Sequence, residues 1–361
     1  MTWGAVTTLS SARGTLTGLL ADTPVNATLP TYGADPSGLI CGYLIDPASA
    51  ARPIDADAAL RRLTTPFPDT AFVWLHFNLA HTGALPWLKT HTGLSDAFYE
   101  MLVEGTHSTR IERDEQALIA VINDVHFDFS FEPSDISTLY THVEQRLVVT
   151  ARKQPLRSVD KLREAVKGGQ PLRSAAELLE HLMRAQADVL VDIVRGATER
   201  VDRIEDELLA NRLDQRRARL GALRRLLVRL QRLLAPEPAA LFRLLQHPPA
   251  WMAELDVQAL RQASEEFSVV LRDMAALQER IKLLQEEIAA QVVEATNRSL
   301  FVLTIVTVLA LPINIIAGLL GMNVGGVPLA QHAHGFWIVV AIVATFTTIA
   351  GWAAFQRQRE R

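Results

Sequence analysis

The chain has 361 residues, of which 49% are hydrophobic and 21% charged, and its formal net charge at pH 7 is -4. This charge and a pI near 6.2 argue against a nucleic-acid-binding protein. The single cysteine, Cys41, excludes an intrachain disulfide and lies in an apolar run where we expect it to be buried. The first 20 residues show no basic stretch followed by an apolar core, so we expect no cleaved signal peptide.

Residues 1–170 mix β-type runs with helical patterns and predict a cytosolic α/β domain. The β-type runs are rich in β-branched and aromatic residues, with Pro and Gly between them. They lie at residues 39–45, 71–78 and 117–127. The helical patterns lie at residues 95–104 and 159–167, and Gln170-Pro171 is expected to end this part of the chain.

Residues 171–298 predict long cytosolic helices and a stalk. From residue 174 to about 234 apolar residues repeat with helical spacing and no Pro interrupts them, which predicts one continuous helix. The prolines of Pro236-Glu237-Pro238 and His247-Pro248-Pro249 predict a turn region that leads to a second long helix. That helix is expected to start near Asp256, a good N-cap residue, and it has no Gly or Pro before Pro312.

The second long helix carries apolar residues at seven-residue spacing in two rows, which is typical of a coiled-coil-like seam. The rows are Leu260, Phe267, Met274, Ile281 and Ile288, and three positions on, Ala263, Val270, Leu277 and Leu284. The opposite side carries Glu265, Glu279 and Glu286, with Arg272 between the first two. This acidic row is either the lining of a cytosolic funnel that concentrates cations or a solvated helix face.

No Asp, Glu, Lys or Arg occurs from residue 299 to 355, and this stretch predicts two transmembrane helices. The long helix has no break before the first of them, so it would be about 100 Å long at about 1.5 Å per residue. Arginines precede the first span and follow the second, which places both chain termini in the cytosol by the positive-inside rule. We assign a first span at 299–320, an outer loop at 321–334, a second span at 335–355 and a basic cytosolic tail at 356–361.

Polar residues inside the first span need neighbouring subunits or local hydrogen bonds, because two helices cannot enclose a polar path alone. Helical spacing puts them on one side of the helix, in a stripe that also contains several leucines. In a symmetric oligomer, each of these residues would form a ring around an axial pore, and the leucine rings could close the pore by dewetting. Alternatively, these threonines bond to their own backbone and these leucines face lipid. The candidate pore-lining residues are Asn297, Leu300, Leu303, Thr304, Thr307, Leu311 and Asn314.

The tripeptide Gly321-Met322-Asn323 directly follows a span that contains Pro312-Ile313-Asn314 and Ile315-Ile316-Ala317-Gly318. Together with the stalk helix, the basic tail and the α/β domain, it resembles the CorA-type metal-ion transporter family, whose signature is Gly-Met-Asn at this place. The resemblance implies an α+β membrane protein that forms a homopentameric funnel. It also implies an ion filter in which Asn323 forms a ring of amides that binds a hydrated cation, Gly321 turns the chain, and Met322 packs behind the ring.

The loop after the tripeptide, Val324-Gly325-Gly326-Val327-Pro328, lacks the acidic residue that magnesium-transporting members usually carry and looks like the ZntB-like zinc-transporting branch. The resemblance therefore implies a transporter of Zn²⁺, with Cd²⁺, Ni²⁺ and Co²⁺ as further candidate ions, in the bacterial inner membrane, with or without proton coupling. A Mg²⁺, Co²⁺ or Ni²⁺ channel of the family and a membrane-anchored coiled-coil sensor without transport are the alternatives. We expect no covalently bound cofactor, and the sequence contains no enzymatic motif.

His332 and His334 form a His-x-His pair in the outer loop, and imidazole is a good zinc ligand. They either recruit zinc at the mouth of the pore or belong to a neutral polar linker, because no third ligand follows nearby. A cluster of arginines in the first long helix is expected to pair with acidic residues or lipid headgroups, and we expect no nucleic acid as a partner. The cluster consists of Arg212, Arg216, Arg217, Arg219, Arg224, Arg225, Arg229 and Arg232.

Overall fold

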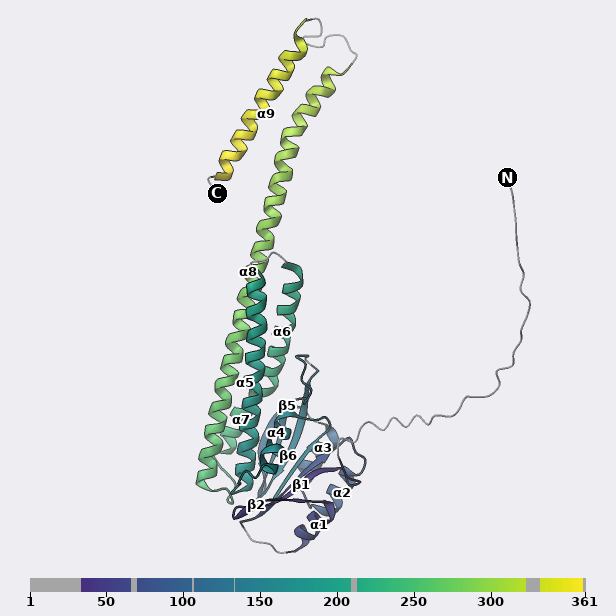
Figure 1. Cartoon of the computed structure of the whole chain (residues 1–361), viewed down its shortest axis with the longest axis vertical. Coiled ribbons are helices and arrows are strands. Elements are labelled where there is room, and N and C mark those ends of the chain that lie inside the picture. The colour runs from purple at the N-terminus through teal and green to yellow at the C-terminus, as the bar shows by residue number, and fades with distance from the viewer. Residues whose placement is uncertain are drawn as a thin grey trace, which may run out of the picture.

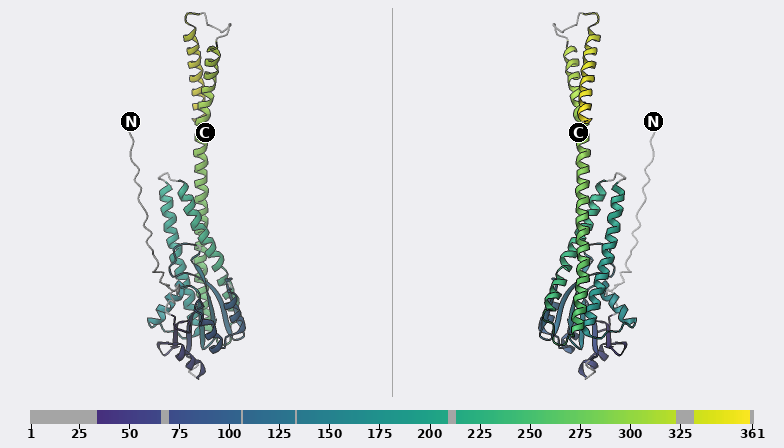
Figure 2. Two further views of the ribbon diagram at one scale, coloured as in Figure 1. Left: turned by 90° about the vertical axis from the view of Figure 1, so that its right-hand side faces the viewer. Right: turned by 90° about the vertical axis from the view of Figure 1, so that its left-hand side faces the viewer.

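The structure is a computed structural model that describes residues 34–65, 70–105, 107–132, 134–208, 213–322 and 332–359. A mixed sheet with helices on both faces forms the base of the molecule, and three long helices extend from it (Figure 1). The longest helix continues well beyond the other two, and a second apolar helix folds back beside its far end (Figures 1 and 2). This architecture confirms the predicted α/β domain, long stalk helix and pair of C-terminal apolar helices.

Seven strands form one sheet in the order β2-β1-β3-β7-β6-β5-β4. The pair β3 and β7 is parallel, and the other neighbouring pairs are antiparallel. Strands β3 and β5 are buried along their whole length, which explains why they read as nearly continuous apolar runs. The strands are β1 (Leu39–Asp46), β2 (Ser49–Ile54), β3 (Phe72–Asn78), β4 (Arg110–Asp114), β5 (Ala117–Val125), β6 (Ile136–Val143) and β7 (Leu147–Arg152).

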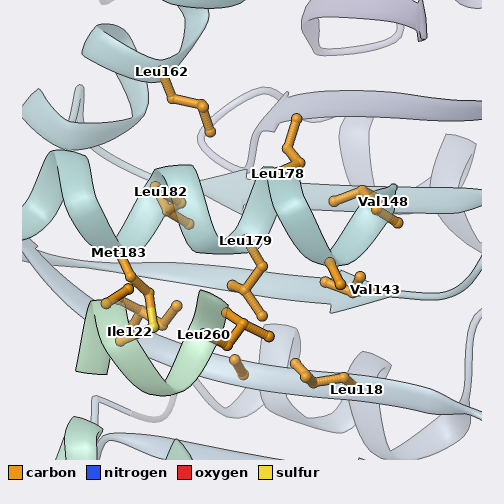
Figure 3. Close-up of a cluster of buried hydrophobic side chains, with 14 of the residues drawn as sticks. Leu118, Ile122, Val143, Val148, Leu162, Leu178, Leu179, Leu182, Met183 and Leu260 are labelled. Atoms are coloured by element: carbon orange, nitrogen blue, oxygen red, sulfur yellow. The ribbon is translucent and has the colours of Figure 1, made fainter. Parts of the chain in front are cut away.

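Helices cover both faces of the sheet because successive strand residues point to opposite sides. Val73, Leu75 and Phe77 are buried on one face, in a cluster with residues of α1 (Ala56–Thr64), α2 (Ala84–His91) and α3 (Asp96–Glu104). Phe72 and Trp74 are buried on the other face. The helices of that face are α4 (Arg157–Lys167), α5 (Ala175–Leu208), α7 (Pro236–Leu244) and the first turns of α8 (Glu254–Leu320). Figure 3 shows Leu162 of α4, Leu179 of α5 and Leu260 of α8 converging over this face.

Beyond the sheet, α5, α6 (Leu213–Leu234) and α8 form a three-helix bundle around one apolar core. All nine residues of the two predicted rows in α8 are buried, and none is more than 7% exposed. The predicted seam is therefore a packing surface: Leu260 and Ala263 pack in the cluster over the sheet, and the other seven residues pack against α5 and α6.

Three predictions about these helices are wrong. Residues 174–234 form two helices, because their apolar stripes can both be buried against α8 only if the chain reverses direction (Figure 2). The Pro236 segment is the start of α7, since the fixed φ and missing N–H of proline suit the first helical position. Asp256 is not the N-cap of α8, because the helix begins at Glu254 after Ala253, and Asp256 lies in the first turn.

Within the described residues, two helices are long and apolar enough to cross a membrane, the C-terminal part of α8 and α9 (Gly335–Arg359). In the most apolar stretch of α8, 0% of the residues are buried by the rest of the chain, and in that of α9 the share is 6%. Apolar helices in the core of a soluble protein would be covered, so this exposure favours contact with lipid. Helix α8 stays continuous through Pro312 and joins the bundle directly to the first span.

Candidate functional site

One side of α8 is left uncovered by the rest of the chain from the stalk to the end of the first span. In the stalk, α5 and α6 cover the two buried rows. In the span, α9 covers the side that carries Ile313, Ile316 and Leu320, with which it lines a shared groove. At about 100° per residue, this side continues the covered side of the stalk. We call the opposite side the uncovered face of α8.

The uncovered face carries the residues that the sequence singled out. Its stalk part holds Glu265, Glu279 and Glu286, and its span part holds Asn297, Leu300, Leu303, Thr304, Thr307, Leu311 and Asn314. All of these side chains are exposed in the single chain, with Leu303 at 62%. The fold thus brings the acidic row and the candidate pore stripe onto one face of one helix, over a length of about 75 Å at about 1.5 Å per residue.

The two threonines of the stripe donate their hydroxyl protons to their own helix. Thr304 Oγ1 donates to the carbonyl of Leu300 at 2.8 Å, and Thr307 Oγ1 donates to the carbonyl of Leu303 at 2.9 Å. These bonds are the local ones that an isolated span would form. They also leave the lone pairs of both hydroxyl oxygens available to accept a hydrogen bond from water or to contact a cation.

The acidic row does not present an unbroken negative surface. Glu279 forms an ion pair with Lys282 at 2.9 Å, and both side chains are exposed. Arg272 is exposed between Glu265 and Glu279. A solvated pair of this kind contributes little to stability, so the row remains free to respond to ions in the medium.

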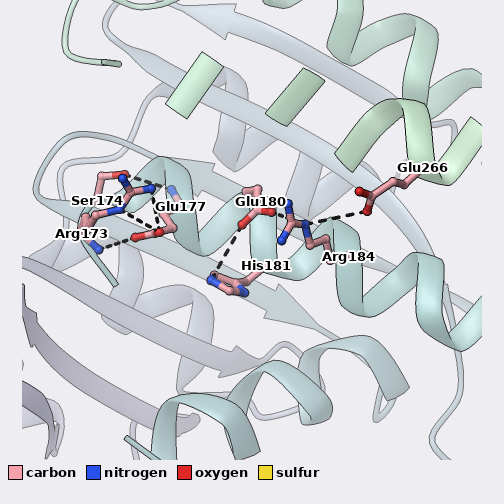
Figure 4. A network of polar contacts seen from close by, with 7 residues as sticks. All are labelled: Arg173, Ser174, Glu177, Glu180, His181, Arg184 and Glu266. Atoms are coloured by element: carbon pink, nitrogen blue, oxygen red, sulfur yellow. Dashed lines mark hydrogen bonds and ion pairs between the residues drawn. The ribbon is translucent and has the colours of Figure 1, made fainter. Parts of the chain in front are cut away.

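Exposed ion pairs link α8 to α5 beside the apolar seam. Arg280 of α8 contacts Asp202 at 2.8 Å and Glu205 at 2.5 Å. Nearer the sheet, Arg184 of α5 contacts both Glu180 of its own helix and Glu266 of α8, as Figure 4 shows. Because these pairs lie beside the apolar seam, they help to determine which side of α8 stays uncovered.

The outer end of the hairpin is partly described. Gly321 ends α8 in a right-handed helical conformation, with φ of -79°, and its N–H donates to the carbonyl of Ala317 at 2.9 Å. Other residues can adopt this conformation, so the sharp turn expected at Gly321 stays a prediction. Met322 is half exposed. Asn323, the central residue of the predicted ion filter, and the following Val324 to Pro328 lie outside the described residues.

His332 and His334 lie close together at the start of α9. Their ring centroids are 6.3 Å apart, and His332 Nδ1 accepts the backbone N–H of His334 at 3.3 Å. Across the described part of the chain, no group of three or more His, Cys, Asp or Glu residues could hold a metal ion. The pair is therefore, at most, part of a site that other chains or residues would complete.

The structure also shows buried carboxylates that sequence patterns did not reveal. Asp124, at the end of β5, accepts the hydroxyl of Ser158 at 2.8 Å and the N–H of Ser158 at 3.0 Å, and burial raises its pKa to about 6. Glu237 of α7 accepts the N–H of Asn123 at 3.0 Å. These two residues attach α4 and α7 to β5 and so fix the base on which α8 stands. No sequence pattern pointed to Glu237, because Pro236-Glu237-Pro238 was interpreted as a turn region.

Known proteins resemble the chain over most of its length. Residues 69–357 match the family described as CorA-like Mg²⁺ transporter proteins. The divalent cation transporter CmaX of Pseudomonas aeruginosa is 29% identical over 90% of this chain and 97% of its own. The zinc transport protein ZntB of Yersinia enterocolitica is 22% identical over 77% of this chain and 85% of its own.

Solved structures show the same fold. Full-length CmaX has a TM-score of 0.75 and 28% identity, covering 90% of this chain and 99% of that one. The CorA magnesium transporter from Methanocaldococcus jannaschii has a TM-score of 0.71 and 20% identity, covering 86% of this chain and 96% of that one.

A stalk helix that runs from an α/β base into the first of two apolar helices is the architecture of a two-span membrane protein. The chain belongs to the CorA-like family of divalent-cation transporters, and ZntB proteins are among its relatives.

Proposed function

We propose that this protein is a homopentamer in the bacterial inner membrane that transports divalent cations, with Zn²⁺ preferred, through an axial pore lined by α8. The observation that supports this most is the uncovered face, which carries amides and hydroxyls within an apolar span. Polar side chains that face lipid cost free energy, so further copies of α8 are the natural cover for this face. Arginines precede the first span and follow the second, which supports a cytosolic location for both chain termini.

In this assembly each residue of the stripe would form a ring around the pore. Rings of Asn297, Thr304, Thr307 and Asn314 offer neutral oxygens that hold a cation through its water shell. Rings of Leu300, Leu303 and Leu311 form apolar collars that close the pore by dewetting. The acidic row in the stalk raises the local concentration of cations on the cytosolic side. Asn323 of the Gly-Met-Asn tripeptide serves as the filter at the outer mouth.

The preference for Zn²⁺ rests on the outer loop and on the relatives. No acidic residue follows the tripeptide from Val324 to Pro328, and two histidines lie in the same loop. One relative is a zinc transport protein and another is a divalent cation transporter. Imidazole favours Zn²⁺ over Mg²⁺, so His332 and His334 would attract zinc to the mouth. The spans carry no Asp, Glu, Lys or Arg, so coupling to protons would have to use these histidines, the acidic row, or protons that move with metal-bound water or anions.

Ion flux into liposomes that contain the purified protein tests this proposal. We expect Zn²⁺ to enter faster than Mg²⁺, and we expect Asn323→Ala and Asn314→Leu each to reduce Zn²⁺ entry by at least about tenfold. Thr345→Val in α9 is the matched control, because its hydroxyl donates to the carbonyl of Ala341 within its own helix, and it should leave the rate unchanged. A series with and without a pH gradient separates a channel from a proton-coupled transporter.

Two results would contradict the proposal. If a folded, oligomeric protein moved neither ion under any gradient, the chain would not be a transporter. If Mg²⁺ entered at least as fast as Zn²⁺, the protein would be a divalent-cation transporter, but the proposed preference for Zn²⁺ would be wrong.

A further inference from the structure

A hollow of about 300 Å³ lies where the loop between β5 and β6 meets α5 and α6, on the outside of the bundle. Arg200 and Arg203 of α5 and Arg219 of α6 line it. The loop contributes Glu132 as the acidic residue of the lining, along with Ser130 and Phe131. Three guanidinium groups and one carboxylate give the lining a net positive charge.

The loop that closes this hollow is held in a fixed shape. Phe131 has a φ of 69°, which is rare for a bulky side chain and costs conformational energy. Its ring fits a notch at Gly196, where an added Cβ would lie 3.0 Å from Phe131 Cζ. The guanidinium of Arg200 stacks 3.6 Å from the centroid of the same ring. Strained backbone of this kind persists where the surroundings over-determine it, and it is common at ligand-binding sites.

Three carboxylates near the hollow are engaged elsewhere. Asp202 and Glu205 of α5 both contact Arg280 on the side of α8. Asp135 of the loop accepts the backbone N–H groups of Ser130 and Glu132, and these bonds lower its pKa. Arg203 donates from Nε to the carbonyl of Glu199 at 3.2 Å, and within the described residues no carboxylate pairs with Arg200 or Arg203. Their positive charge is therefore directed at the hollow.

The hollow lies too far from the membrane to bind a lipid headgroup. Arg280 contacts α5 at Asp202 and Glu205, next to Arg203, and so marks the level of the hollow along α8. The charge-free stretch of α8 begins at residue 299, which is about 28 Å further along at about 1.5 Å per residue. A ligand for these arginines must therefore be soluble in the cytosol.

We propose that this hollow binds the phosphate group of a small soluble anion, either inorganic phosphate or the phosphomonoester of a metabolite. A guanidinium presents two N–H groups in the geometry of two phosphate oxygens, and arginine is the side chain best suited to this recognition. Because Arg203 comes from α5 and Arg219 from α6, a bound phosphate bridges the two helices. Binding therefore stabilises their pairing at the end of the bundle nearer the membrane.

Calorimetric titration of the full-length protein in detergent tests this, with inorganic phosphate and adenosine monophosphate as probes, in metal-free buffer at constant ionic strength. We expect at least one probe to bind, and Arg203→Ala to weaken its binding by roughly tenfold or more. Arg203→Lys keeps the positive charge but loses the paired N–H groups of the guanidinium, so it should weaken binding to an intermediate degree. Arg229→Ala is the matched control, because Arg229 is exposed on α6 and does not line the hollow. It should change the affinity by less than about twofold.

The comparison of probes identifies the ligand, since tighter binding of inorganic phosphate favours the free ion and tighter binding of the nucleotide favours a phosphomonoester. Absence of binding to the folded wild-type protein at roughly 10 mM of either probe would overturn the proposal. Equal weakening by Arg203→Ala and Arg229→Ala would also overturn it, because that result would show only a general attraction to a basic surface. The readout is binding, so it is independent of whether the protein transports ions.

Discussion

Glu237 illustrates what one buried carboxylate does at the base of the molecule. It is 0% exposed, and one of its oxygens accepts the N–H of Asn123 while its other oxygen has no hydrogen-bond partner within the described residues. Gln186 donates to the carbonyl of Asn123 at 2.7 Å, and its own Oε1 also lacks a partner. Burial raises the pKa of Glu237 well above its usual value of 4.5. A negative charge at this position therefore destabilises the fold.

We expect Glu237→Gln to stabilise the protein at neutral pH by about 1 kcal/mol. A folded-state pKa above the unfolded value means that Glu237 costs stability as pH rises above 4.5, and glutamine does not titrate. The amide oxygen can still accept the N–H of Asn123, and the amide group offers a donor to Gln186. Thermal unfolding should give the glutamine variant a higher Tm than wild type at pH 7.5, with a smaller difference near pH 5.

Glu237→Ala is the control for this experiment, because it removes the charge and also leaves the N–H of Asn123 without its partner. It should lower the Tm at every pH. A glutamine variant that is less stable than wild type at pH 7.5 would show that the carboxylate is charged and well solvated in the fold.

We expect His142 to make the protein less stable in mild acid. Its side chain is 0% exposed and packs edge-on against Phe98, with ring centroids 5.3 Å apart, and burial lowers its pKa to about 4. Because the folded pKa lies below the unfolded value of 6.5, stability is full above pH 6.5 and falls as the pH decreases toward 4. Between pH 6.5 and 5 the loss from this residue is about 2 kcal/mol.

The measurement compares the change in Tm between pH 7 and pH 5 for wild type, His142→Leu and His247→Leu. His142→Leu should reduce that change, whereas His247→Leu, which alters an exposed residue, should leave it as in wild type. An unchanged pH dependence in His142→Leu would mean that the buried imidazole does not resist protonation.

At the scale of single elements, the seam of α8 should contribute most to the stability of the bundle. Phe267 is 0% exposed and lies in the core shared by α5, α6 and α8. We expect Phe267→Ala to reduce the free energy of unfolding by about 3–5 kcal/mol, because it removes buried apolar surface and leaves a cavity. Denaturant unfolding monitored by circular dichroism measures this change.

Val228→Ala is the matched control, since Val228 is 46% exposed on the outer side of α6. Its effect should stay within about 0.5 kcal/mol. A loss from Phe267→Ala no larger than that of the control would mean that the seam does not stabilise the bundle in solution.

Secondary structure was predictable where one physical signal dominated. Strands β3 and β5 and the seam of α8 carry long apolar or seven-residue patterns, and each was predicted. Strands β6 and β7 were missed because their buried positions include Thr138, Thr141, His142 and Thr150, which hide the apolar pattern. The break between α5 and α6 was missed because neither Gly nor Pro marks it, and only packing against α8 requires the reversal.

The candidate site was predictable only in part. Helical spacing grouped Asn297, Thr304, Thr307 and Asn314 on one face, and the structure leaves that face uncovered. Sequence could not show that this face and the side of the stalk that carries Glu265, Glu279 and Glu286 are both left uncovered, because this depends on where α5, α6 and α9 pack. The arginine-lined hollow was likewise hidden, since it joins residues from a loop and two helices that are distant in sequence.

At the scale of the whole molecule, the alignment of stalk and span should matter for transport. We expect insertion of two alanines after Thr296 to abolish Zn²⁺ flux, because each residue rotates the span by about 100° relative to the stalk. Insertion of seven alanines rotates the span by about 700°, which is only about 20° less than two full turns. This variant should therefore retain flux. Liposome flux of both variants beside wild type is the measurement, with oligomer mass in detergent as the check on assembly.

Equal flux from the two insertion variants, both assembled as in wild type, would show that the acidic row and the pore stripe need not share one face. If only the two-residue variant failed to assemble, the alignment of stalk and span would be required for oligomer formation.

The unbroken course of α8 makes the molecule a lever. Its 67 residues span about 100 Å at about 1.5 Å per residue, and the helix is continuous from Glu254 at the sheet to Leu320. A tilt of one degree about the base of such a rod displaces the far tip by about 2 Å, which is comparable to the radius of a water molecule. Small shifts of packing between α5 and α8 are therefore enlarged at the far end of α8, so the α/β base has mechanical leverage over residues that it never touches.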